Sequence, residues 1–257
     1  MYVSVAVMDT GIFRHMDFDT RIAGFADFVG RKKYLYDDNG HGTHVAGIIA
    51  GSGKGSNGKY RGIAPDTFLV SVKVLDKSGN GKIENVVEAA GWIIENKSAM
   101  NIRVVNISFG TRAKMENGPA IETGEDDYAL IMAVEKMWDS GIVVVAAAGN
   151  NGPGNTSVTA PGISKRIITV GAFDDKNFFS GRGPTRECIV KPEVVVTGSN
   201  IIACNNHQGR YSSKSGTSMA APVVSGAVAR LIKNNPDITP KEVKIWMKSC
   251  CKKINVP

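Results

Sequence analysis

Short runs of β-branched residues alternate with longer stretches of helical character along this chain. Five runs predict strands that are buried on both faces, at residues 2–9, 67–75, 103–109, 141–148 and 166–173. Helices are predicted at residues 42–51, 84–97, 126–141 and 218–235, and each pattern ends at or beside a Gly or Asn. Buried strands that are separated by helices are typical of a parallel sheet.

This order of elements predicts an α/β protein with three layers, in which helices cover both faces of a mainly parallel central sheet. The 257 residues suffice for one large domain or for two small ones. No Pro/Ser-rich linker, repeat or low-complexity tract divides the sequence. We therefore expect residues 1–257 to form a single domain.

Composition narrows the classes of function. Hydrophobic residues make up 42% of the chain, and its 29 glycines suit a globular protein with many tight turns. The longest apolar runs are much shorter than the ~20 residues that span a bilayer, and no signal-peptide pattern is present, so no membrane partner is expected. The formal charge is +7. Because Lys and Arg are scattered, a solvated surface explains this charge better than nucleic-acid binding does.

Four cysteines occur at positions 188, 204, 250 and 251. Their spacing fits neither a zinc site nor an obvious disulfide framework. Reduced thiols in a cytoplasmic protein are the simplest interpretation. The alternative is a secreted, processed chain in which Cys188 and Cys204 form a disulfide.

Polar residues stand at four ends of predicted elements. Asp9 ends the first strand, Asn150 follows the strand at 141–148, and His41 and Ser218 each open a helix. Ligands of such sheets bind at the carboxyl ends of the strands. We therefore expect these four side chains to lie close together.

Ser218 has two interpretations. Serine at a helix start commonly caps it by accepting a hydrogen bond from a free backbone N–H. The same N–H groups and the helix dipole also stabilise negative charge that develops beside a nucleophile. A nucleophilic Ser218 needs a base and an orienting carboxylate, roles that His41 and Asp9 can fill. The Asn150 amide and the Ser218 N–H can then bind the oxyanion.

Four sequence motifs carry a resemblance to a known family. VMDTG, NGHGTHVAG, AAAGNNGPG and SGTSMAAP resemble the aspartate, histidine, oxyanion-asparagine and serine motifs of the subtilisin-like serine proteases (subtilases, peptidase family S8). The order Asp, His, Ser matches that family. KVLDKSGNG, NISFG and FFSGRGPT also resemble its segments, and the overall likeness favours the intracellular bacterial AprX-like branch. The resemblance implies a subtilisin-like fold, an Asp9/His41/Ser218 triad and Asn150 as oxyanion donor.

The resemblance also implies how a peptide substrate binds. An extended peptide would pair with two backbone edges, formed by Gly79, Asn80 and Gly81 on one side and by Ser108, Phe109 and Gly110 on the other. The pocket for the residue before the scissile bond would be lined by Ala147, Ala148 and Gly149. An apolar pocket further upstream would be formed by Ile83, Val86 and Phe109.

Other polar residues have structural interpretations. His44 lacks the spacing and the glutamate of a helical zinc site, and His15 and His207 are expected to be exposed. Asp37 and Asp38 are expected at the surface, where they cap the helix that His41 opens. The loop GSGKGSNGKYRG contains no carboxylate, and because only eight residues precede Asp9, we do not expect the N-terminal extension that many secreted relatives use in a calcium site. We expect no calcium site of that type, and no cofactor.

The expected function is that of a serine endopeptidase acting on protein or peptide substrates through an acyl-enzyme. The alternative is a catalytically silent subtilase fold that serves as a binding or scaffold protein. Intact Asp9, His41, Ser218 and Asn150 argue against the silent alternative. A propeptide or protein inhibitor outside this chain is a further expected partner.

Overall fold

A computed structural model describes residues 2–111 and 124–251 of the chain. Its main sheet contains seven parallel strands in the order β2-β3-β1-β4-β5-β6-β7. The strands are β1 (Ser4–Asp9), β2 (Ile22–Asp27), β3 (Phe68–Lys73), β4 (Ile102–Ile107), β5 (Val143–Ala147), β6 (Ile168–Ala172) and β7 (Val194–Val196). A separate antiparallel hairpin consists of β8 (Ile201–Cys204) and β9 (Tyr211–Lys214).

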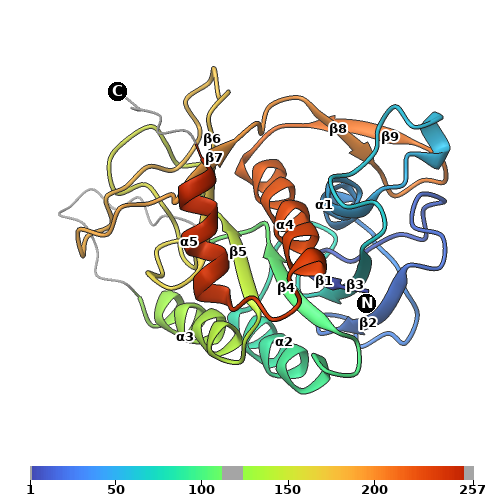
Figure 1. The fold of residues 1–257 in the computed structure, drawn as a ribbon, viewed down its shortest axis with the longest axis horizontal. Coiled ribbons are helices and arrows are strands. Elements are labelled where there is room, and N and C mark those ends of the chain that lie inside the picture. Colours follow the sequence, from blue (N-terminus) through green and yellow to red (C-terminus); the bar gives the residue numbers. More distant parts are fainter. Residues whose placement is uncertain (1, 112–123, 252–257) are drawn as a thin grey trace.

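Helices cover both faces of this sheet (Figure 1). Two of them, α2 (Ile83–Asn96) and α3 (Glu125–Asp139), pack on one face. The helices α1 (His41–Ala50), α4 (Thr217–Asn234) and α5 (Pro240–Cys250) pack on the other. A short 3-10 helix, η1 (Lys54–Ser56), follows α1. The expected three-layer α/β fold is confirmed.

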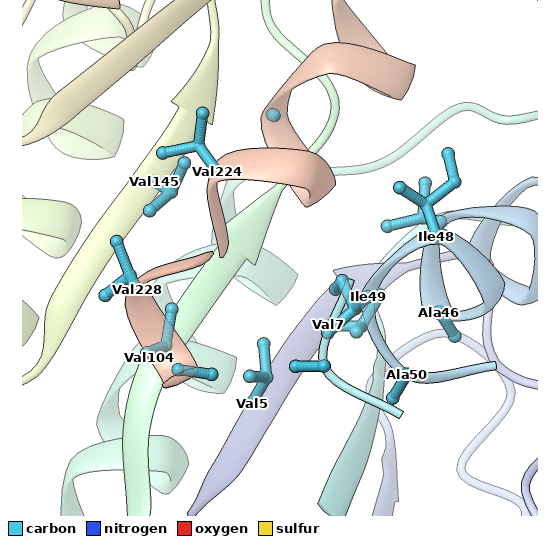
Figure 2. Packing of buried hydrophobic residues seen from close by; sticks show 14 of the residues in the cluster. Val5, Val7, Ala46, Ile48, Ile49, Ala50, Val104, Val145, Val224 and Val228 are labelled. Carbon is cyan, nitrogen blue, oxygen red and sulfur yellow. The ribbon is translucent and has the colours of Figure 1, made fainter. Parts of the chain in front are cut away.

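The alternation of side chains along each strand creates two separate cores. Val5 and Val7 of β1 point toward α1 and α4, whereas Ala6 and Met8 point toward α2 and α3. Figure 2 shows the first core, in which Val224 and other apolar side chains of α4 lie over the sheet. Burial of each such valine stabilises the fold by roughly 1.5–3 kcal/mol. Both faces are therefore apolar, as the β-branched runs predict.

The register of the sheet determines which residues lie side by side at the ends of neighbouring strands. Met8 of β1 pairs with Ile107 of β4, and Ile107 pairs with Ala146 of β5. The next residues along these strands are Asp9, Ser108 and Ala147. They therefore lie side by side at the carboxyl edge of the sheet, where the sequence predicts the candidate catalytic side chains.

The cysteines and the helices bear on two further expectations. All four thiols are free, with Cys204 buried and Cys188 exposed, so the alternative of a Cys188–Cys204 disulfide is wrong for this structure.

Across residues 2–111 and 124–251, no helix combines the length and the apolar character needed to cross a bilayer.

Candidate active site

Asp9 and His41 form a close pair at the carboxyl edge of the sheet. Asp9 is the last residue of β1 and is fully buried, and His41 is the first residue of α1. The His41 Nδ1 atom lies 2.8 Å from Asp9 Oδ1 and 2.9 Å from Oδ2. An ionised carboxylate only accepts hydrogen bonds, so Nδ1 carries the proton and Nε2 is left as the basic nitrogen.

The groups around His41 determine the pKa of its imidazole. Burial of the imidazole opposes its charged form, but the Asp9 carboxylate outweighs burial, and the pKa of His41 is raised above 6.5. Lys214 opposes this rise, and Asp37 adds to it. An imidazole with a raised pKa is a stronger base for a nearby hydroxyl.

The first turn of α1 is held by side chains that satisfy its free N–H groups. The His41 N–H donates to Asn39 Oδ1, the Gly42 N–H to Thr10 Oγ1 and the Thr43 N–H to Asp37 Oδ2. The surface position expected for Asp37 is therefore wrong, because its buried carboxylate bonds into the helix start.

Asp38, in contrast, is exposed as expected, and its carboxylate forms an ion pair with Lys73 at 2.7 Å. In the part of the chain that the structure describes, this carboxylate accepts no helix N–H, so only the surface position of Asp38 is confirmed.

Ser218 is the second residue of α4 and does not cap it. The N-cap residue is Gly216, which has no side chain, and the first N–H of the helix, that of Thr217, donates to Asn150 Oδ1. The Ser218 hydroxyl instead donates to the Ser108 carbonyl at 2.8 Å. Ser108 directly follows β4 beside Asp9, so Ser218 lies at the same edge as the Asp9–His41 pair. Within the described residues, the Ser218 hydroxyl is bonded to Ser108 and not to His41.

Pro222 frees the carbonyl of Ser218 from the helix ladder. Proline has no N–H, so Ser218 O lacks the usual donor four residues later. The Ser108 hydroxyl takes that place and donates to Ser218 O at 3.0 Å. Ser108 is held in turn by Asn106 Nδ2 at 2.9 Å. Ser108 therefore contacts the Ser218 main chain and side chain at once.

Asn150 projects from the loop after β5 toward the start of α4. Its Oδ1 accepts hydrogen bonds from the N–H and the hydroxyl of Thr217, both at 3.0 Å. A backbone N–H can only donate, so the Thr217 main chain fixes which way the amide faces. Among the described residues, Asn150 Nδ2 has no hydrogen-bond partner. Gly216 has φ +146, and a Cβ there would lie 3.3 Å from Nδ2, so glycine keeps this donor accessible.

The comparisons with known proteins agree with this geometry. The sequence model of the subtilase family matches residues 2–254. The chain belongs to the subtilase family. Serine protease AprX from Bacillus subtilis is 42% identical over 96% of this chain, and Subtilisin DY from Bacillus licheniformis is 35% identical over 94%. The chain spans 60% of the length of AprX and 81% of that of Subtilisin DY.

Solved structures confirm the fold of this subtilase. A cold adapted subtilisin-like serine proteinase matches with a TM-score of 0.77 at 31% identity, covering 96% of this chain and 81% of that one. Sphericase matches with a TM-score of 0.80 at 26% identity, covering 96% and 82%. The family and the likeness to AprX that the motifs indicated are thus confirmed.

Most of the predicted substrate-binding residues line one cavity of this subtilase. They come from the segment before α2, from α2 itself and from the segment after β4: Gly79, Asn80, Gly81, Ile83, Val86, Phe109 and Gly110. The remaining four, Ser108, Ala147, Ala148 and Gly149, do not line it, and the two alanines are buried. The first turn of α3 adds the acidic residues Glu125, Asp126 and Asp127 to the lining.

Two other histidines of this subtilase have buried structural contacts. His44 Nε2 lies 3.1 Å from Ile201 O and 3.0 Å from Ser212 O, so it ties α1 to the β8–β9 hairpin. Burial lowers the pKa of His44 to about 4, which keeps it neutral. The expected exposure of His15 is wrong, because Phe18 and Tyr211 pack against its buried ring. His207 is exposed, as predicted.

Asp17 is the centre of a buried cluster behind α1. The loop after α1 lacks carboxylates, but it folds over this one: Gly53 and Gly55 donate backbone N–H groups to Asp17 at 3.0 Å and 2.9 Å. The Tyr211 hydroxyl lies 3.0 Å from both carboxylate oxygens. His15, Asp17 and Cys204 offer ligand atoms within 4.8 Å of one another. A cation there would have to displace these N–H and O–H donors.

Removal of divalent ions is expected to leave the stability of this subtilase almost unchanged. Only an ion that binds the native state stabilises it by mass action, and donors already occupy the Asp17 carboxylate. The melting temperature should be measured with EDTA and with added calcium. A large drop in EDTA that calcium reverses would contradict this prediction.

Proposed function

We propose that this subtilase is a serine endopeptidase with Asp9, His41 and Ser218 as its triad. The Asp9–His41 pair carries the proposal, because its 2.8 Å contact leaves His41 Nε2 as the free base. The Ser218–Ser108 hydrogen bond supports it by holding the nucleophile at the same edge of the sheet. The curated relatives are named as serine proteases and subtilisins, which agrees with this chemistry.

The proposed reaction begins when the Ser218 hydroxyl leaves Ser108 O and attacks the substrate carbonyl. Its proton passes to His41 Nε2, and Asp9 stabilises the imidazolium that forms. The carbonyl oxygen becomes negative and accepts hydrogen bonds from Asn150 Nδ2 and the Ser218 N–H. His41 then protonates the leaving amine, which leaves an acyl group on Ser218. Water then gives a proton to His41 and attacks this ester, and the imidazolium returns a proton to Ser218 Oγ as the acid product leaves, which restores the serine.

The family indicates that the substrates are proteins or peptides. How such a substrate lies in the cleft is part of the proposal. The Gly79–Gly81 segment and the Ser108–Gly110 segment would pair with an extended peptide through main-chain hydrogen bonds. The lining of the cavity by Ile83, Val86 and Phe109 supports an apolar upstream pocket. A propeptide or protein inhibitor, and a cytoplasmic location, stay predictions from the sequence.

Covalent labelling separates an active protease from a catalytically silent subtilase fold. A fluorophosphonate probe should label the wild-type chain at Ser218, because only an activated serine reacts readily. Ser218→Ala should remain unlabelled, and Ser249→Ala, which alters an exposed serine of α5, should be labelled like the wild type. Absence of labelling in a folded wild-type protein would favour the binding or scaffold alternative.

The raised pKa of His41 predicts the acidic limit of activity. A protonated imidazole cannot act as base, so kcat/KM should fall as pH drops through the His41 pKa, and this fall should be centred above pH 6.5. NMR titration of the histidines in Ser218→Ala provides an independent measurement. His44 is an internal control, because its pKa near 4 keeps it neutral in the same titration. A His41 pKa below 6.5 would contradict the prediction.

A further inference from the structure

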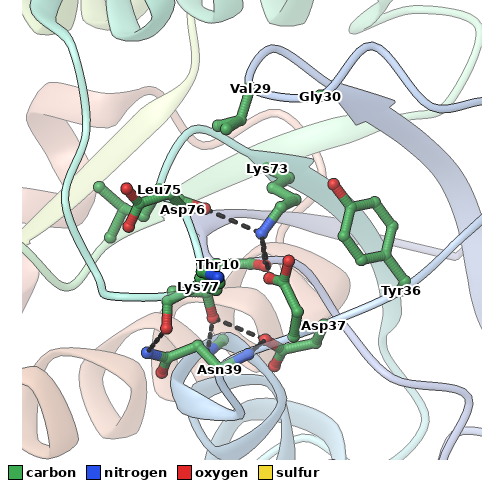
Figure 3. Close-up of polar contacts among 12 residues, drawn as sticks. Thr10, Val29, Gly30, Tyr36, Asp37, Asn39, Lys73, Leu75, Asp76 and Lys77 are labelled. Atoms are coloured by element: carbon green, nitrogen blue, oxygen red, sulfur yellow. Dashed lines mark hydrogen bonds and ion pairs between the residues drawn. The ribbon is translucent and has the colours of Figure 1, made fainter.

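Asp37 lies between the segment that contains Asp9 and the segment that contains His41. Its side chain is buried, with 6% of the residue exposed. Oδ1 accepts the Thr10 hydroxyl at 2.9 Å, the Asn39 N–H at 3.1 Å and the Gly40 N–H at 2.8 Å. Oδ2 accepts the Thr43 N–H at 2.9 Å and its hydroxyl at 2.6 Å. Five donors thus converge on one carboxylate, and Figure 3 shows its links to Asn39 and Thr10.

These donors belong to the segments on either side of the proposed catalytic pair. Thr10 directly follows Asp9, whereas Gly40 and Thr43 lie on either side of His41. Thr10 Oγ1 also accepts the Gly42 N–H at 2.9 Å, so Asp37, Thr10 and α1 form a closed network. Asp9 and His41 are 32 residues apart in the chain, and Asp37 is connected to the segments of both.

The junction between the end of β1 and the start of α1 is tightly packed as well as bonded. A Cβ at Gly42 would lie 2.1 Å from the Gly11 carbonyl oxygen, so only glycine allows this approach. On the other side, the buried ammonium of Lys73 donates to Thr10 O at 2.6 Å (Figure 3). The segment after Asp9 is therefore held from both sides, and Asp37 is its link to α1.

We propose that Asp37 is a positioning residue, which fixes the angle and distance between the His41 imidazole and the Asp9 carboxylate. The inference rests on the proposed function of that pair. Small displacements of a catalytic base are costly, because proton transfer needs atoms aligned within a few tenths of an ångström. Loss of Asp37 should slow the chemical step and should leave substrate affinity unchanged.

Asp37→Asn tests this role with little change in side-chain shape. Each Asp37 oxygen faces a backbone N–H, and an amide has only one oxygen, so one anchor must break. Asp27→Asn is a matched control. Asp27 is 7% exposed, and its two oxygens accept three backbone N–H groups and the Tyr36 hydroxyl, with no bond to the Asp9 or His41 segments.

The expected result is a fall in kcat of roughly tenfold to a hundredfold for Asp37→Asn, with KM within about twofold of the wild type. Asp27→Asn should keep the wild-type kcat, even if it lowers the melting temperature. If Asp37→Asn does not fold, Thr10→Val replaces it, because that change cuts the link between Asp37 and Gly42 and retains the Asp37–Thr43 bonds.

A second measurement shows whether Asp37 acts through His41. In a His41→Ala background, Asp37→Asn should change the residual kcat by less than about twofold, because the base that it positions is gone. A loss of the same size in both backgrounds, an effect on KM alone, or an equal loss of kcat in Asp27→Asn would overturn the proposal. An inactive wild type that fails to react with fluorophosphonate would instead refute the proposed function.

Discussion

Ser218→Ala and His41→Ala should each remove nearly all peptidase activity, by roughly 10⁶-fold in kcat, which is the order found for a subtilisin. The double variant should be hardly worse than either single variant. A serine hydroxyl is a poor nucleophile until a base takes its proton, and the base has no role without the nucleophile. The two losses are therefore expected to overlap almost completely.

Steady-state kinetics on a fluorogenic peptide, with each variant checked for its melting temperature, would measure this overlap. Conversion of the fully buried Asp9 to Asn should also lower kcat, because an amide can accept the Nδ1–H only in one orientation. Single losses that add up in the double variant would show that Ser218 and His41 do not act as a unit.

The sheet was predictable from the sequence because its central strands are buried on both faces. The run predicted at 141–148 corresponds to β5, Val143–Ala147, and the helix predicted at 84–97 corresponds to α2, Ile83–Asn96. The edge strands β2 and β7 escaped prediction. Gly24 interrupts the half-exposed β2, and β7 has only three residues. Neither presents an apolar run that is long enough to indicate a strand.

Helix α5 also escaped prediction, although its start carries a recognisable signal. Thr239 and Glu242 form a capping box, and Pro240 occupies the first turn. Only Val243 and Met247 of this helix are buried, so its apolar stripe is narrow. The capping residues therefore indicate the helix better than its hydrophobic pattern does.

The candidate site was predictable as a set of residues but not as a hydrogen-bonded network. Motif spacing placed Asp9, His41, Ser218 and Asn150 at element ends, and the structure brings them to one edge of the sheet. The supporting contacts of Asp37 depend on tertiary packing, which no local pattern records. One supporting contact does have a signal in the sequence. Pro222 lies four residues after Ser218 and has no N–H, so Ser218 O must find another donor.

Asn150→Ala should lower kcat by roughly 10²–10³-fold and change KM little, a magnitude taken from a subtilisin oxyanion asparagine. The physical reason lies in the orientation of the amide. Thr217 holds Asn150 Oδ1, which leaves Nδ2 for a charge that develops only when the carbonyl is attacked. An interaction made only in the transition state affects kcat, whereas ground-state binding affects KM.

Asn150→Asp separates this donor from the structural role of the side chain. A carboxylate can still accept the Thr217 N–H and hydroxyl, so the start of α4 should keep its geometry and the melting temperature should change little. It offers no donor, however, and places a negative charge where the oxyanion forms. We therefore expect kcat to fall at least as far as in Asn150→Ala. If Asn150→Asp retained wild-type kcat, or if either variant changed only KM, Asn150 would not be the oxyanion donor.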